Sequence, residues 1–99
     1  MAIVTKPKDK GTQSKVDLVF RWDLQGAAHI SSKVIVGSSA GAEDYYIGTE
    51  KSSGTYTDDK VVGQPGGNKT CYTRPKYRKV ANGPWYTTLS LTTSFVSTD

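Results

Sequence analysis

One segment, residues 16–24, limits what this chain can fold into more than any other. It reads VDLVFRWDL, and its large apolar side chains fall on alternate residues while charged side chains fill positions between them. Alternate side chains point to opposite faces of a β-strand, so this pattern indicates a half-buried strand. The face that carries the aromatic rings supplies three expected core residues, Leu18, Phe20 and Trp22.

Further short β-prone segments follow at intervals of roughly ten residues, separated by clusters of Gly, Pro, Asn and Ser. They are residues 30–37, 45–49, 55–62, 69–80 and 84–96. No segment has apolar residues at the i, i+3, i+4, i+7 spacing of an amphipathic helix. We therefore expect an all-β sandwich. These strands are expected to add four core residues, Val34, Val36, Leu89 and Leu91.

Four of these segments together resemble the fibronectin type III family. NGPWYTTLSLTT at 82–93 is similar to the end of such a domain, where Gly-Pro-Trp leads into the last strand. The other three are VDLVFRWDL, SSKVIVGSSAG and GQPGGNKTCY, which resemble the second strand, the third strand and the turn before the sixth. The resemblance implies a seven-stranded antiparallel β-sandwich of the fibronectin-III/Ig-like type over residues 16–99.

Two residues depart from the family pattern. Gly63 stands where the family has a leucine before its Pro-Gly turn. Pro75 lies inside a segment that should be a central strand, where a proline removes a hydrogen-bond donor from the ladder. Either the strand has a bulge at Pro75, or it is an edge strand.

The first fifteen residues differ in composition from the rest. Residues 5–15 have no apolar side chain and carry four lysines, a proline and a glycine. This composition predicts a flexible basic arm over residues 1–15, and the alternative is a first edge strand. Three lysines of this arm, Lys6, Lys8 and Lys10, are candidate partner-binding residues.

The net charge of +4 comes entirely from residues 51–99, which suggests a basic face. Arg74, Lys76 and Arg78 recur at every second residue, so a strand would project them from one face. Such a row could be an ordinary solvated surface, bind an acidic protein, or meet the phosphates of a nucleic acid. Nucleic acid is disfavoured because few aromatic side chains interleave with the charges. Tyr46 is a further candidate contact residue.

Catalytic residue types are scarce. The chain has one histidine, His29, and one cysteine, Cys71, which are too few for a zinc site. We expect no enzymatic activity, no metal and no cofactor. Cys71 is expected to be a small buried side chain, and the alternative is a thiol that faces or cross-links a partner.

The absence of a long apolar run bears on location. No apolar stretch approaches the roughly 20 residues that span a bilayer, and none near the N-terminus has signal-peptide length. By analogy with Ig-like and fibronectin-III-like modules of tailed phages, we expect a virion protein that decorates a capsid or tail. Its partners would be capsid or tail subunits, or further copies of itself, and not a membrane. The alternative is an extracellular or cell-surface adhesion or carbohydrate-binding module.

Overall fold

The computed structural model describes residues 3–24, 30–52, 56–60 and 65–99. Within these residues the chain forms nine β-strands, two short 3-10 helices and no α-helix. The strands are β1 (Ile3–Lys6), β2 (Gly11–Ser14), β3 (Val19–Asp23), β4 (Ser31–Gly37), β5 (Tyr46–Ile47), β6 (Lys51–Ser52), β7 (Tyr56–Lys60), β8 (Lys69–Arg78) and β9 (Thr93–Thr98). The 3-10 helices are η1 (Lys15–Asp17) and η2 (Leu89–Leu91). The fold is therefore all-β, as the alternating pattern predicts.

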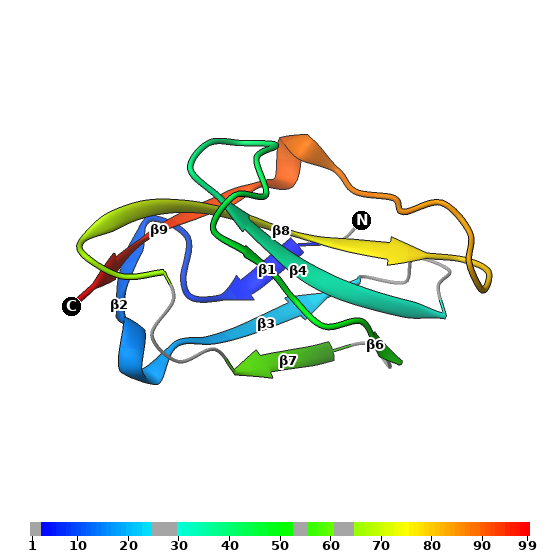
Figure 1. Cartoon of the computed structure of the whole chain (residues 1–99), viewed down its shortest axis with the longest axis horizontal. Coiled ribbons are helices and arrows are strands. Elements are labelled where there is room, and N and C mark those ends of the chain that lie inside the picture. Colours follow the sequence, from blue (N-terminus) through cyan, green and yellow to red (C-terminus); the bar gives the residue numbers. More distant parts are fainter. Residues whose placement is uncertain (1–2, 25–29, 53–55, 61–64) are drawn as a thin grey trace.

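The strands form two sheets that face each other (Figure 1). The smaller sheet has the order β1-β3-β7, and the larger has the order β2-β9-β8-β4-β5, with β6 also pairing with β4. The described part of the fold differs from the expected seven antiparallel strands in the number of strands and in the direction of one pairing. The described residues form nine strands, and β2 pairs with β9 in parallel.

The N-terminal segment belongs to the fold instead of forming a flexible arm. β1 pairs with β3, and β2 pairs with β9, so this segment contributes an edge strand to each sheet. Val4 of β1 is only 2% exposed and joins the core. The arm was expected to be flexible because its side chains are polar, but backbone hydrogen bonds to a neighbouring strand need no apolar side chain. The alternative, a first edge strand, describes these residues better.

The core lies between the two sheets, where the inward faces of their strands meet. Its fully buried members include five residues expected there, Leu18, Phe20, Trp22, Val34 and Val36. The indole N–H of Trp22 donates to the hydroxyl of Ser32 at 2.8 Å, which links the smaller sheet to the larger. The ring of Phe20 meets that of Phe95 edge-on, with centroids 5.7 Å apart. This contact brings β9 into the same core.

Leu91 does not close the core as expected. Leu91 lies in η2 and is only partly buried, and the side chain of Leu89 lies outside the described part of the structure. The last strand begins at Thr93, later than the alternation suggested. Its buried ring is Phe95, which has the same parity as the two leucines. A 3-10 turn before the strand therefore replaces the predicted longer strand.

Pro75 lies in the middle of β8 without a bulge. The pairing of β8 with β4 keeps one register from Ser31–Arg78 to Gly37–Tyr72. Tyr77 exchanges both of its backbone hydrogen bonds with Tyr86. The backbone N–H and C=O groups of the odd-numbered residues in this part of β8 therefore point away from β4. On that side β9 pairs with β8 only as far as Thr73, which leaves the position of Pro75 free of a ladder partner. The missing N–H of Pro75 therefore costs no hydrogen bond to β4.

Candidate protein-binding face

The candidate site is the outer face of the larger sheet, on the side of β4 and β8 that faces away from the core. Arg74, Lys76 and Arg78 share this face because residues of the opposite parity, such as Thr73 and Pro75, are buried on the inner side. The ladder places Lys33 of β4 directly opposite Lys76. Like charges at opposed positions repel each other, so this face needs nearby carboxylates.

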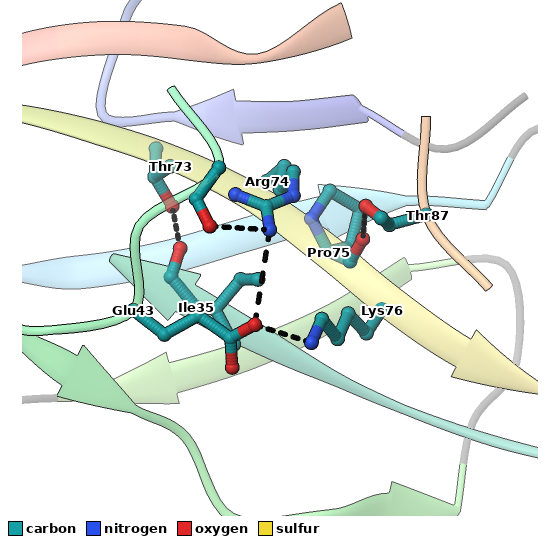
Figure 2. A network of polar contacts seen from close by, with 8 residues as sticks. Ile35, Glu43, Thr73, Arg74, Pro75, Lys76 and Thr87 are labelled. Carbon is teal, nitrogen blue, oxygen red and sulfur yellow. Dashed lines mark hydrogen bonds and ion pairs between the residues drawn. The ribbon is translucent and has the colours of Figure 1, made fainter. Parts of the chain in front are cut away.

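Arg74 does not project into solvent as the sequence predicted. Its exposure is only 3%, because the loop of residues 38–44 folds back over it. The guanidinium donates from Nη2 to the carbonyl of Gly41 at 3.3 Å and lies 3.8 Å from Glu43 (Figure 2). Burial lowers the pKa of Arg74, and the nearby charge of Glu43 opposes this shift. Its Nε and Nη1 atoms are buried and make no hydrogen bond.

Local hydrogen bonds and a close backbone approach hold the 38–44 loop against the sheet. The backbone N–H and the hydroxyl of Ser38 both donate to Asp44 at 2.8 Å, and these bonds lower the pKa of Asp44. The backbone of Ala42 passes so close to Gly37 that a Cβ there would lie 2.1 Å from the Ala42 carbonyl oxygen. Only glycine permits this approach. The loop therefore covers the middle of the outer face.

Two glutamates that the sequence analysis did not select meet the remaining basic residues. Lys76 pairs with Glu43, the same carboxylate that lies near Arg74 (Figure 2). Arg78 binds Glu50 through two nitrogens, one of them Nε at 3.0 Å, and Ser31 donates to the same carboxylate. The hydrogen bonds from Arg78 and then from Ser31 are the main causes of the lowered pKa of Glu50. The side chains of Lys76 and Arg78 are 20% and 18% exposed, so both remain accessible at the surface.

One aromatic ring, that of Trp85, completes this face at the end of β8. The Nζ of Lys33 and the guanidinium carbon of Arg78 each lie 4.4 Å from the centroid of the Trp85 ring. Tyr86 stacks on Tyr77 across a β-bridge, and Tyr77 packs against the core, so Tyr86 and its contact Lys79 lie on the opposite side of the strand. We call Lys33, Arg78 and Trp85 the aromatic–cation cluster. In the sequence, Trp85 marks only the approach to the last strand, because nothing local to it reveals the contact with β4.

Tyr46 was a candidate contact residue, but its ring and hydroxyl are engaged inside the molecule. Its ring stacks on Phe20 with centroids 6.4 Å apart, and its hydroxyl donates to Asp59 at 2.9 Å. Burial, followed by the hydrogen bond to Asp59, raises the pKa of Tyr46 to about 12. Asp59 is itself buried and lies 3.9 Å from Lys51. Tyr46 therefore joins β5 to β7 and does not belong to the outer face.

The three N-terminal lysines are exposed but lie away from the aromatic–cation cluster. Lys6 ends β1 in the smaller sheet, whereas Lys8 and Lys10 lie in the connection to β2. The backbone N–H of Lys10 donates to Ser94 of β9 at 2.6 Å. Since β9 lies on the side of β8 away from β4, the structure does not gather these lysines with Arg78.

Cys71 and the other reactive residue types do not form a site in the described residues. Cys71 is fully buried, and burial raises its pKa to about 11, so the alternative of a thiol facing a partner is wrong. His29 lies outside the described residues. In the part of the chain that the structure describes, no three His, Cys, Asp or Glu residues are grouped to hold a metal. The same residues contain no helix of the length and apolarity needed to cross a bilayer.

Comparisons with known proteins add no relative to this picture. No protein-family model matches the sequence, and searches of curated proteins and of solved structures found no match either. The strand order and the chemistry of the outer face are therefore the basis for the assignments that follow.

Proposed function

We propose that this chain is a non-enzymatic structural module that binds a protein surface through the outer face of β4 and β8. The observation that carries the proposal is the aromatic–cation cluster. Both Lys33 and Arg78 contact the ring of Trp85, which is partly exposed. Trp, Tyr and Arg are the residue types that contribute most to protein interfaces. Stacked against rings, these cations lose less conformational entropy when a partner binds.

We also propose that the sandwich is of the fibronectin-III/Ig-like type. Ig-like sandwiches place the first, second and fifth strands in one sheet and the third, sixth and seventh in the other. The order β1-β3-β7 against β4-β8-β9 supports this arrangement if β2, β5 and β6 are additions to it. The buried Trp22 on β3 also supports it, since the second strand of the family ends in a core tryptophan. The parallel pair of β2 and β9 is the main departure.

The proposed partner is a capsid or tail subunit of a virion, on which Ig-like modules of tailed phages commonly sit. This step rests on analogy between folds. A test is to mix the purified chain with tailed-phage capsids and tails stripped of accessory proteins, and to pellet the particles. We expect the wild-type chain to sediment with them in a saturable manner. Trp85→Ala should reduce the bound amount, whereas the control Val16→Ala, at an exposed apolar residue of η1, should not.

The same variant distinguishes the virion protein from the alternative of an adhesion or carbohydrate-binding module. A partly exposed tryptophan beside polar side chains can also stack on a sugar ring, and Trp85 is partly exposed beside Lys33 and Arg78. Retardation of the chain on polysaccharide affinity gels, lost in Trp85→Ala, together with no binding to particles, would favour that alternative. Self-association is measured by sedimentation equilibrium of the chain alone.

A further inference from the structure

The outer face carries more positive than negative charge in the described residues. The cations of β4 and β8 on this face are Lys33, Arg74, Lys76 and Arg78, and the carboxylates that reach them are Glu43 and Glu50, an excess of two positive charges. Lys33 has no carboxylate of the described residues within ion-pair distance and contacts the ring of Trp85 instead. The face can therefore accept a further carboxylate at Lys33.

The spacing of these cations suits an extended chain. Lys76 and Arg78 are two residues apart on one strand, which separates them by about 7 Å. Alternate side chains of an extended peptide repeat at the same interval. Lys33 lies on the neighbouring strand opposite Lys76, about 5 Å away across the ladder. A segment with acidic residues at alternate positions would therefore bring successive carboxylates to successive cations.

The two internal glutamates occupy positions that such a segment would take. Glu43 reaches Lys76 from the 38–44 loop, and Glu50 reaches Arg78 from the connection between β5 and β6. Both come from connecting segments, and the side chain of Glu50 is 38% exposed. Because Glu50 is exposed and comes from a connecting segment, a carboxylate from a partner can take its place on Arg78.

We propose that the outer face of β4 and β8 binds an extended acidic protein segment, whose carboxylates replace Glu50 on Arg78 and add to Lys33. This inference rests on the proposed function, because it names the chemistry of the partner at that same face. Electrostatic complementarity of this kind sets the specificity and the association rate of a complex more than its affinity.

The probe is a ten-residue synthetic peptide that alternates Glu and Ser, titrated into the full chain and followed by calorimetry. We expect saturable binding that weakens as salt is added, because salt screens exposed charges beyond about 8 Å at physiological strength. Lys33→Gln should weaken the binding about threefold, and Glu50→Gln should tighten it about threefold, the size expected for one exposed ion pair.

Two matched variants control for net charge. Lys60→Gln and Asp17→Asn make the same charge changes at exposed residues, one on β7 of the smaller sheet and one on η1. Their dissociation constants should stay within twofold of the wild-type value. Equal shifts in these controls would overturn the proposal, since binding would then follow total charge. A peptide with its glutamates in one block should bind less tightly than the alternating peptide.

Other outcomes separate this inference from the proposed function. Tighter binding of a ten-residue thymidine oligonucleotide than of the alternating peptide would overturn the acidic protein segment and identify a nucleic-acid face. Saturable, Trp85-dependent binding to particles without binding to the peptide would leave the proposed function standing and overturn the acidic partner. Peptide binding with the expected variant effects, but no binding to any particle, would overturn the virion partner alone.

Discussion

β3 and β8 are both central strands with alternating sequences, yet their outer faces differ. β3 lies between β1 and β7, and its outward Arg21 is exposed as the alternation predicts. β8 lies between β9 and β4, but in its middle Thr73, Arg74 and Pro75 are all buried. The difference comes from the 38–44 loop, which covers the outer face of β8. Alternation therefore predicts which face a side chain occupies, but not whether that face meets solvent.

The largest expected effect concerns the inward-facing side chains of β3. We expect Trp22→Ala to destabilise the protein by about 3–5 kcal/mol, because it leaves a large cavity between the sheets. The substitution also leaves the hydroxyl of Ser32 without the indole donor. Urea denaturation followed by circular dichroism measures the loss. An unchanged midpoint would contradict the position of Trp22 in the core.

A second test compares the outer faces of the two strands directly. Arg74→Ala should cost about 2 kcal/mol, because it removes packing beneath the 38–44 loop, whereas Arg21→Ala should cost about 0.5 kcal/mol. Arg74→Met should restore most of the stability, since a methionine fills the space without unpaired buried nitrogens. Equal losses for the two alanine variants in urea denaturation would show that the loop does not cover Arg74.

A third test concerns Asp59, the buried acidic residue of β7, the strand that pairs with β3. Asp59 lies opposite Phe20 in the ladder and accepts the hydroxyl of Tyr46. Tyr46→Phe removes this hydrogen bond to a buried carboxylate, so we expect a loss of about 1.5 kcal/mol at neutral pH. The measurement is again the free energy of unfolding in urea.

The pH dependence of the same variant has a defined direction. The pKa of Tyr46 rises from 10.0 to about 12 on folding, so between these values the unfolded chain has lost a proton that the folded protein keeps. The stabilising contribution is complete below pH 10 and falls as the pH rises to about 12. Tyr46→Phe should therefore lose stability less steeply over that window. Cys71, whose pKa rises to about 11, contributes to both proteins and cancels in the difference. Identical slopes would contradict the buried hydroxyl.

The smallest effect is expected for a reagent that leaves stability unchanged. Cys71 lies on the inner side of β8 and is fully buried, so dithiobis-nitrobenzoate should label it slowly in the native state and rapidly in denaturant. Rapid native labelling would mean that β8 is rotated by one residue. In that case Arg74 and Cys71 would exchange faces, and the comparison with β3 would fail.

The sequence predicted the parts of the fold that depend on side-chain alternation within one strand. Phe20, Trp22 and Val36 are buried, and Cys71 and Thr73 face inward as their parity indicates. The sequence did not distinguish the strands β1 and β2 from a flexible arm, because edge pairing depends on backbone groups that every residue carries.

The candidate site was predictable only as a row of basic residues. Arg74, Lys76 and Arg78 do share a face, but their partners Glu43 and Glu50 lie about 30 residues away in sequence. Which glutamate meets which cation depends on the register of β4 with β8 and on the path of the connecting loops. Neither leaves a local pattern, so the burial of Arg74 could not be predicted.

The parallel pairing of β2 with β9 has a mechanical consequence. Force applied at Gly11 and Thr98 pulls the two strands past each other, so that their four register pairs, from Gly11–Phe95 to Ser14–Thr98, resist together. Force applied at Lys69 and Thr98 instead acts on neighbouring ends of β8 and β9 and opens their ladder one bond at a time. We expect a higher rupture force for the first pair of attachment points in single-molecule pulling. Equal forces would show that the short parallel ladder does not carry tension.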